Sequence, residues 1–474
     1  MLDSFFHPRG VAVIGATESP LKGGFHIVRN ALAGYRGPLY PVNPRYGEIL
    51  GIPCYPDIDS IPENFDLAVY FIPARFLPET IRACARRGVK GIIIESAGFS
   101  EVGPKGVRLQ EQSIAEARRH GIRLWGPNCM GYLDGHSRNV FSFMYTDAWT
   151  TLMKPGSVSL IVQSGMLSAG FLMMVLERGG MGISKVCSIG NKCDVHETEL
   201  LEYLVDDPNT GVIGCYLESI VDGRKFMDLA RSTEKPVVVL KAGRSDSGAL
   251  AAKSHTGSLS GSATVYNGAF RQAGIIQVYD MHELMDMVRG LSMTRSFTPS
   301  DRTAVVTFSG GAGIVTADLL EDRGFRLAGL APETMAALKE IFPPWMEPSH
   351  PVDLWPAVEQ KGPDAVYTGA VEAIMKDPSV DSVIIETFAW EFGEPDYLVR
   401  IGEMKERYGK PAVLWQVGRG SNVERDRSVA EEAGIPVFGE ISRCVAFLDS
   451  LRRHFRKVEK LRGGNTAPAS IAGA

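Results

Sequence analysis

The chain has 474 residues, 45% of them hydrophobic, and a formal net charge of −5, so we expect two to four domains with ordinary buried cores and no strong attraction to nucleic acid or an anionic membrane. No apolar run approaches the ~20 residues of a transmembrane helix, and the N-terminus lacks a signal-peptide pattern. The seven cysteines are scattered and contain no Cys-x-x-Cys, which favours a cytoplasmic protein without disulfides. Cys193 and His196 have a zinc-like spacing but no second pair, so we expect no metal site.

Short apolar runs alternate with helix-like segments along the chain. The runs lie at Val11–Ile14, Leu67–Phe71, Gly91–Ile94, Ser159–Val162, Val212–Leu217, Val237–Leu240, Ala304–Phe308, Val383–Glu386 and Ala412–Gln416. This alternation is typical of α/β proteins, in which helices cover both faces of a parallel sheet. The sequence predicts three α/β units, at 1–145, 150–295 and 300–455, and a flexible tail at 456–474 that is rich in small residues.

The first apolar run leads into a glycine-rich segment, Gly15–Gly24, that precedes a helix-like stretch. Such a turn places backbone N–H groups and a helix N-terminus against a phosphate. The segment does not read Gly-x-Gly-x-x-Gly, and Arg45, rather than an acidic residue, follows the next strand. These features favour a ligand with an additional phosphate over NAD, although the same turn also serves as an ordinary structural connection.

Two polar positions follow strands of the second unit. Ser164-Gly165 begins the helix after Ser159–Val162 and offers an oxyanion site, but Ser309–Gly313 in the third unit is equally rich in glycine, so the pattern can also be the turn chemistry of the fold. Glu218 directly follows Val212–Leu217, and parallel sheets place ligands at the carboxyl ends of their strands. Glu218 is therefore either an orienting carboxylate or a solvated strand end.

The segment Gly243–Gly261 is rich in Gly, Ser and Ala and contains His255. Small residues let such a loop bend and present N–H groups to an oxyanion. A neutral imidazole can act as a nucleophile near neutral pH. The pattern predicts a phosphohistidine on a mobile loop, with Glu218 holding Nδ1–H of His255, as the acid orients the base in a catalytic triad. The alternative is a mobile surface loop with an incidental histidine.

The second and third units share landmarks in the same order, which indicates a duplication. Ser159–Gly165, Asp207–Thr210 and Lys235–Arg244 correspond to Ala304–Gly310, Asp377–Val380 and Lys410–Arg419. After the shared Gly-Arg, the third unit lacks the histidine segment. The candidate nucleophile therefore belongs to one copy.

Taken in order, these motifs resemble the α subunit of ADP-forming acyl-CoA synthetases, in the succinyl-CoA synthetase superfamily. The resemblance is carried by Val11–Gly24, Tyr40–Arg45, Trp125–Gly131, Gln163–Gly165, Ser188–Asp194, Tyr216–Ser219 and Lys241–Gly261. It implies an N-terminal Rossmann-like CoA-binding domain over 1–145. Two flavodoxin-like domains of the succinyl-CoA synthetase type would follow, over 150–295, with the phosphohistidine loop, and over 300–455.

The resemblance also implies roles for individual residues. His255 would be phosphorylated transiently, with Glu218 as its partner. CoA would contact Gly15, Ala16, Thr17 and Lys22 through its phosphates, Asn43 and Arg45 through its nucleotide, and Pro73, Glu95, Ser96 and Asn128 near its thiol. Phosphate and the acyl group would meet Ser164, Gly165 and Met166. Arg45 departs from the family, which often has Lys at this position.

The implied reaction interconverts carboxylic acid, CoA and ATP with acyl-CoA, ADP and phosphate, through an acyl phosphate and a phosphohistidine. No segment resembles an ATP-grasp module, so we expect ATP, ADP and Mg²⁺ on a partner β subunit. The other expected partners are a small carboxylic acid or acyl-CoA, and phosphate. Two alternatives stay open: a non-catalytic CoA- or acyl-CoA-binding regulatory or scaffolding subunit, and an NAD-type dehydrogenase, which the first turn disfavours.

Overall fold

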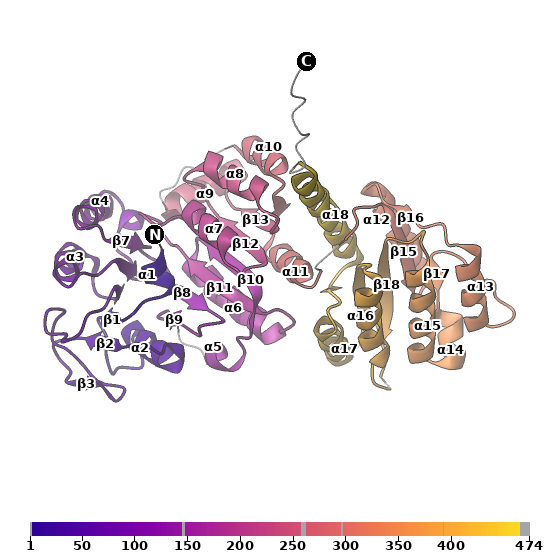
Figure 1. Ribbon diagram of the computed structural model, residues 1–474, viewed down its shortest axis with the longest axis horizontal. Coiled ribbons are helices and arrows are strands. Elements are labelled where there is room, and N and C mark those ends of the chain that lie inside the picture. Colours follow the sequence, from indigo (N-terminus) through magenta and orange to yellow (C-terminus); the bar gives the residue numbers. More distant parts are fainter. Residues whose placement is uncertain (1, 145–146, 257–261, 295–296, 392, 465–474) are drawn as a thin grey trace, which may run out of the picture. The chain divides into compact units, whose positions relative to one another are not determined.

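The computed structural model describes residues 2–144, 147–256, 262–294, 297–391 and 393–464. The chain forms two compact units, Met1–Leu284 and Met285–Ala474. In each unit, helices cover both faces of mainly parallel β-sheet, which confirms the predicted α/β class (Figure 1). Among the described residues, no helix is long and apolar enough to cross a membrane.

The first sheet has five parallel strands in the order β2-β1-β5-β6-β7. Its strands are β1 (Val11–Ile14), β2 (Leu39–Val42), β5 (Leu67–Tyr70), β6 (Gly91–Ile94) and β7 (Arg123–Trp125). Its helices are α1 (Asp3–Phe6), α2 (Gly23–Gly34), α3 (Leu77–Arg86) and α4 (Pro104–Arg119), with 3₁₀ turns η1 (Ala74–Phe76) and η2 (Ser100–Val102) and a small hairpin β3 (Glu48–Ile49) and β4 (Ile52–Pro53). The strand order reverses between β1 and β5, which is where doubly wound sheets bind ligands.

The second sheet has seven strands in the order β14-β13-β12-β10-β11-β8-β9. Its parallel strands are β10 (Pro155–Val162), β11 (Ile183–Ser188), β12 (Val212–Leu217), β13 (Val237–Lys241) and β14 (Ile276–Val278). Antiparallel strands β8 (Tyr132–Asp134) and β9 (Val140–Phe141) extend its edge, so a segment expected in the first unit joins the second sheet. The helices are α5 (Ala148–Thr151), α6 (Gly165–Arg178), α7 (Glu197–Asp206), α8 (Gly223–Ser232), α9 (Asp246–Thr256) and α10 (Ala263–Ala273).

The first two sheets share one hydrophobic core. Phe6, at the end of α1, stacks on Tyr203 with ring centroids 4.0 Å apart and meets Tyr132 edge-on at 5.0 Å. The buried indole of Trp125 packs against Phe6 at 6.0 Å and donates a hydrogen bond to the carbonyl oxygen of Ser188 at 2.7 Å. Because this core is continuous, residues 1–284 form one unit rather than two independent ones.

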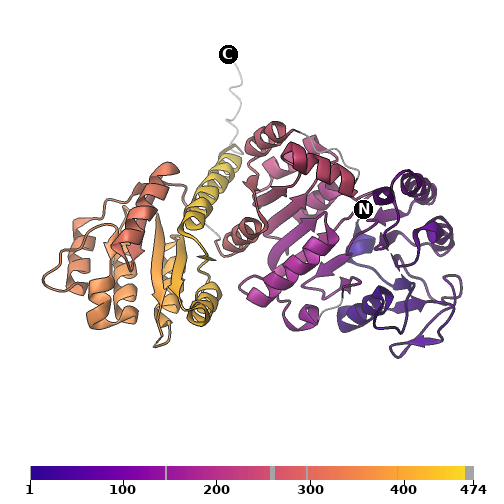
Figure 2. The same cartoon turned by 180° about the vertical axis from the view of Figure 1, so that it is seen from behind.

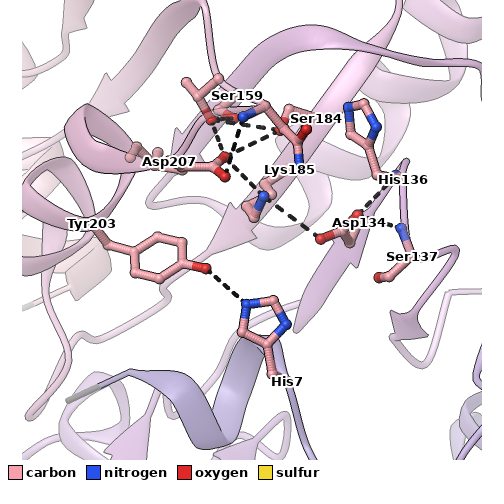
Figure 3. Close-up of polar contacts among 12 residues, drawn as sticks. His7, Asp134, His136, Ser137, Ser159, Ser184, Lys185, Tyr203 and Asp207 are labelled. Carbon is pink, nitrogen blue, oxygen red and sulfur yellow. Dashed lines mark hydrogen bonds and ion pairs between the residues drawn. The ribbon is translucent and has the colours of Figure 1, made fainter.

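A buried ionic network lies toward the amino-terminal ends of the second sheet's strands (Figure 3). Lys185 Nζ lies 2.8 Å from Asp207 Oδ2 and 3.7 Å from Asp134 Oδ2, and these three side chains are almost completely buried. Asp134 also accepts the N–H groups of His136 and Ser137, each at 2.8 Å. The network therefore fixes the added strand β8 to β11 and to the start of β12.

The unit Met285–Ala474 contains the third sheet, ordered β16-β15-β18-β19-β20 with β17 beside β15. Its strands are β15 (Arg302–Thr307), β16 (Arg326–Leu327), β17 (Val352–Asp353), β18 (Ser382–Ala389), β19 (Ala412–Gly418) and β20 (Val437–Phe438). Its helices are α12 (Gly310–Asp322), α13 (Pro332–Ile341), α14 (Trp355–Lys361), α15 (Pro363–Lys376), α16 (Asp396–Tyr408), α17 (Gly420–Glu432) and α18 (Ile441–Gly464), and α11 (Met281–Ser292) enters it from the first unit.

Two features of the unit Met285–Ala474 can be compared with the predictions from the sequence. Its strand order matches that of the parallel strands in the second sheet, which agrees with a duplication. Figure 2 shows the sheets and their covering helices from behind. Helix α18 continues to Gly464, so residues 456–464, expected in a flexible tail, are helical. Val458, near the end of this helix, is buried, and burial of apolar side chains stabilises a helix more than intrinsic propensity does. The rest of that expected tail, 465–474, lies outside the described residues.

Candidate functional site

A pocket of about 530 Å³ opens where the carboxyl ends of strands from the first two sheets meet. It contains six of the residues that the sequence predicted for a site: Pro73, Glu95, Ser96, Asn128, Ser164 and Gly165. The other lining residues are Phe71, Ile72, Ala97, Cys129, Phe143, Gln163, Gly190 and Asn191. These segments follow β5, β6, β7, β10 and β11, so the pocket lies at the edges where parallel sheets bind ligands.

Hydrogen bonds between loops hold the first-sheet wall of the pocket. Ser96 Oγ donates to the carbonyl oxygen of Ile72 at 2.8 Å, and the N–H of Asn128 donates to the carbonyl oxygen of Ser96 at 3.0 Å. Asn128 has a positive φ of 56°, which asparagine tolerates better than most residues. Asn191, from the second sheet, donates to Glu101 Oε2 at 2.6 Å. These bonds tie the wall loops of both sheets together.

Glu95 gives the pocket a buried carboxyl group. Its side chain is 4% exposed, and Oε2 accepts the N–H of Phe143 at 2.9 Å. Burial raises the pKa of Glu95 well above its ordinary value, against the opposing effect of the Phe143 hydrogen bond. Burial therefore favours the protonated, uncharged form of this carboxyl group.

Gln163 connects β10 to the end of β12. Its Oε1 accepts the N–H of Glu218 at 2.8 Å and that of Ser219 at 3.3 Å. Glu218, the predicted partner of the histidine, is buried at this strand end. Sequence reasoning included Gln163 in a motif but gave it no role, although its place directly before Ser164-Gly165 was a usable signal.

Two buried lysines lie near Glu218; the sequence analysis included both in motifs but gave them no role. Lys192 Nζ donates to Glu197 Oε2 at 2.8 Å and to the carbonyl oxygen of Ser219 at 2.7 Å. Burial, together with the charge of Lys192, lowers the pKa of Lys241 to about 8, and Glu218 opposes this shift. Lys241 Nζ also lies 4.6 Å from the ring centroid of Tyr266. The end of this sheet thus has the positive charge that a phosphoryl group requires.

The side chains of His255 and Met166 lie outside the described residues, so the pairing of His255 with Glu218 stays a prediction. The backbone of His255 falls in α9, and that of Met166 in α6. Helix α9 corrects the expectation of a continuous loop over 243–261. Its residues Ala249–Lys253 are Ala, Leu, Ala, Ala and Lys, all strong helix formers.

A second pocket, of about 440 Å³, lies at the switch point of the first sheet and shares Ile72 with the first pocket. Gly15 and Asn43 line it. Asn43 Nδ2 donates to the carbonyl oxygen of Ala16 at 2.7 Å, and Asn43 Oδ1 accepts the N–H of Arg45 at 3.0 Å. The second pocket therefore abuts the predicted phosphate turn.

The remaining residues of the predicted phosphate turn differ in exposure. Ala16 and Thr17 are buried beside the turn, and the Thr17 hydroxyl lies 3.1 Å from that of Tyr46. Lys22 and Arg45 are exposed, and neither is among the lining residues of these two pockets. Gly15 has a φ of 94°, and a Cβ there would lie 2.5 Å from the carbonyl oxygen of Phe71, so the backbone requires glycine at this point.

His196 has a structural role in place of the weak zinc pattern. Its Nδ1 accepts the N–H of Thr198 at 3.3 Å and so caps the start of α7. Burial raises the pKa of the Cys193 thiol to about 12, which keeps it protonated. Within the described ranges, no three His, Cys, Asp or Glu side chains are grouped to hold a metal ion.

Comparisons with known proteins agree with this geometry. Residues 9–134 match the CoA binding domain family, and residues 155–291 match the family described as succinyl-CoA ligase like flavodoxin domain. The chain is 37% identical to acetate–CoA ligase (ADP-forming) II of Archaeoglobus fulgidus, over 96% of this chain and 67% of that protein. It is 37% identical to the α subunit of acetate–CoA ligase (ADP-forming) II of Pyrococcus furiosus, over 92% of this chain and 94% of that subunit.

A solved structure shares the fold over the whole chain. This is dinucleotide forming acetyl-coenzyme A synthetase 1 of Ca. Korarchaeum cryptofilum, in complex with phosphate and ADP, with a TM-score of 0.88 and 32% identity. The match covers 98% of this chain and 99% of that one. These findings confirm the resemblance seen in the sequence: the chain belongs to the family of ADP-forming acid–CoA ligases of the acetate–CoA ligase type.

Proposed function

We propose that this chain is the catalytic α subunit of an NDP-forming acid–CoA ligase. It interconverts carboxylic acid, CoA and ATP with acyl-CoA, ADP and phosphate, through an acyl phosphate and a phosphohistidine. One observation carries the proposal: the 530 Å³ pocket joins the strand ends of the region that matches CoA binding domains to those of the region that matches succinyl-CoA ligases. An acyl group can therefore pass between CoA and phosphate within one cavity.

CoA spans the two pockets that share Ile72. Its nucleotide lies at the 440 Å³ pocket, beside the turn at Gly15. There Ala16 and Thr17 offer backbone N–H groups, Asn43 supports the turn, and Lys22 and Arg45 supply positive charge. Its thiol end enters the 530 Å³ pocket beside Pro73, Glu95, Ser96 and Asn128. The burial that raises the pKa of Glu95 favours its protonated form, which suits a thioester because a thioester has no positive group to pair with a carboxylate.

Phosphate and the acyl group bind at the start of α6, at Ser164, Gly165 and Met166. A helix N-terminus favours an anion through its exposed N–H groups and its dipole. His255 then takes the phosphoryl group from the acyl phosphate, and Glu218 orients its imidazole. Lys192 and Lys241 balance the added negative charge.

ATP, ADP and Mg²⁺ belong to an ATP-grasp β subunit that assembles with this chain. In support, the chain covers 67% of the A. fulgidus relative and 94% of the P. furiosus relative, whose name is that of an α subunit. The part of the longer A. fulgidus protein that this chain does not match would correspond to the β subunit. The acid is a small carboxylic acid. We use acetate and acetyl-CoA as probes because both relatives are named as acetate–CoA ligases.

Phosphorylation tests the proposal. We expect the full chain, incubated with acetyl-CoA and ³²P-phosphate, to incorporate label that survives alkali and is lost in mild acid, as a phosphoramidate is. His255→Ala should carry no label, and Glu218→Gln should acquire it more slowly. His282→Ala, at an exposed histidine of the same chain, is the matched control and should label normally. Undiminished labelling of His255→Ala would overturn the proposed nucleophile.

A further inference from the structure

The wall of the 530 Å³ pocket contains an amide donor without a protein partner. Gln163 is 2% exposed, and its Nε2 has no hydrogen-bond partner among the residues that the structure describes. A buried donor left unpaired costs free energy, so such atoms in native proteins call for a ligand or a water as partner. Gln163 also lines the 530 Å³ pocket, so this buried amide belongs to the wall of the cavity.

The orientation of this amide is fixed by chemistry. The backbone N–H groups of Glu218 and Ser219 both point at one terminal atom of Gln163, at 2.8 and 3.3 Å. Two donors require an acceptor, so that atom is the carbonyl oxygen and the other is the NH₂ group. With Oε1 held at the end of β12, Nε2 cannot turn away to find another partner.

The duplicated sheet shows that the fold itself does not need a polar side chain here. Ile161 pairs with Cys215 in the second sheet, as Val306 pairs with Ile385 in the third. Two residues after Ile161 and Val306 stand Gln163 and Phe308.

The position that faces Gln163 across the second sheet is also polar there and aromatic in the third sheet. Three residues after Cys215 and Ile385 stand Glu218 and Phe388, and the rings of Phe308 and Phe388 pack with centroids 6.3 Å apart. An aromatic contact therefore replaces the Gln163–Glu218 bridge in the third sheet. The second sheet keeps the polar pair beside the pocket.

We propose that Gln163 is a catalytic residue whose Nε2–H donates a hydrogen bond to the carbonyl oxygen of the acyl group. This inference rests on the proposed function. In the acyl-CoA-forming direction, the CoA sulfur attacks the carbonyl carbon of the acyl phosphate, a C–S bond forms, and the C–O bond to phosphate breaks. Phosphate leaves with that electron pair, and the thiol proton ends on it as HPO₄²⁻. The carbonyl oxygen becomes negative in the tetrahedral intermediate, where the fixed donor stabilises it.

The same amide also links the acyl pocket to the phosphohistidine step. Its Oε1 positions the strand end that presents Glu218, while its Nε2 contacts the acyl group. A single rigid side chain thus aligns the two half-reactions. Loss of the donor alone should impair acyl transfer and leave the Glu218 strand end in place.

Gln163→Glu is the decisive variant because it keeps an acceptor for the N–H groups of Glu218 and Ser219 and removes the donor. Gln163→Met removes both functions. The matched control is Gln277→Glu on β14, the same change in the same sheet, where Gln277 Nε2 donates to Asn267 at 2.7 Å. The full-length proteins are titrated with [1-¹³C]acetyl-CoA by calorimetry, and the thioester carbonyl stretch is then recorded by isotope-edited infrared spectroscopy.

We expect a carbonyl band shifted to lower frequency in the wild type and in Gln277→Glu, and a return toward the solution frequency in both Gln163 variants. The rate of acetyl transfer from acetyl phosphate to CoA should fall about 10²-fold or more in Gln163→Glu, with the Kd for CoA changed less than about twofold. An unchanged band in a Gln163 variant that binds acetyl-CoA would overturn the inference and leave the proposed function intact. Failure of the wild type to bind acetyl-CoA would overturn both.

Discussion

The ammonium of Lys185 lies 2.8 Å from a carboxylate oxygen of Asp207, and both side chains are almost completely buried (Figure 3). Burial alone would raise the pKa of Asp207, but hydrogen bonds from Lys185 and Thr210 outweigh it and hold that pKa below its ordinary value. Asp207→Asn leaves Lys185 with Asp134 as its remaining carboxylate, at 3.7 Å. We expect the unfolding free energy to fall by about 3 kcal/mol or more, as measured in urea.

The effect of Asp207→Asn should depend on pH in a defined direction. Because the folded-state pKa of Asp207 is lowered, the carboxylate contributes its stability above the unfolded value of about 3.9 and loses it as the pH falls through the folded value. The gap between wild type and variant should therefore close on acidification below about pH 4. Asp228→Asn, at an exposed pair with Arg231, is the control and should change stability by less than about 1 kcal/mol.

Glu95→Gln should stabilise the chain above about pH 4.3, whereas Asp207 contributes stability that is lost below about pH 4. The raised pKa of Glu95 means that the folded state holds a proton that the unfolded state releases above about pH 4.3, so the wild type loses stability as the pH rises from there toward the folded-state pKa. The glutamine variant has no such loss. We expect the two thermal midpoints to agree near pH 4.5 and the variant to unfold at a progressively higher temperature than the wild type as the pH rises from there toward the folded-state pKa of Glu95. A gap that is independent of pH would contradict the assigned protonation state.

Lys241→Met should weaken the binding of inorganic phosphate roughly tenfold at pH 7, because a charged hydrogen-bond donor near the anion site contributes about 1.5–3 kcal/mol. The pKa of Lys241 is about 8, so the wild-type residue itself loses its charge in more alkaline solution. Calorimetric titration should therefore show a large difference between the proteins at pH 7 and a small one at pH 9. Lys225→Met, at an exposed lysine paired with Glu202, should bind phosphate like the wild type at both pH values.

The sequence was sufficient to locate strands that are buried on both faces. Val11–Ile14, Gly91–Ile94 and Val212–Leu217 were predicted as they occur, because a strand covered by helices on both sides is a continuous apolar run. Strand β11 was missed because Lys185 and its neighbour Ser184 interrupt its apolar pattern. Their burial depends on Asp207 and Asp134, which are distant in the sequence.

In the candidate site, too, the residues that follow predicted strands could be located from the sequence, and those whose environment depends on tertiary contacts could not. Ser164-Gly165 and Glu218 follow predicted strands, so the rule that ligands bind at carboxyl ends was enough to place them at this edge of the sheet, while their roles stay predictions. Gln163 and Lys241 sit at strand ends too, but a glutamine or lysine there looks like a solvated side chain in the sequence. Their proposed roles rest on burial and on hydrogen bonds across the sheet, which the linear pattern does not contain.

Arg45 provides a test of whether the 440 Å³ pocket region binds CoA through its 3′-phosphate. Its backbone N–H is held by Asn43 Oδ1 at 3.0 Å, while its side chain is exposed beside the predicted phosphate turn. If this side chain contacts the 3′-phosphate of CoA, Arg45→Ala should weaken the binding of CoA about tenfold or more and change the binding of 3′-dephospho-CoA little. The reason is that the charge-assisted contact is lost only for the ligand that carries the 3′-phosphate.

The control and the salt dependence make this test specific. Arg36 is also exposed but precedes β2, whereas Arg45 follows it, so Arg36→Ala removes an equal charge at the opposite end of the strand and should leave CoA binding unchanged. The loss in Arg45→Ala should shrink at high ionic strength, because exposed charges are screened over about 10 Å at 0.1 M salt. Equal weakening of CoA and 3′-dephospho-CoA, or tighter binding of NAD than of CoA by the wild type, would show that Arg45 does not select the ligand through that phosphate.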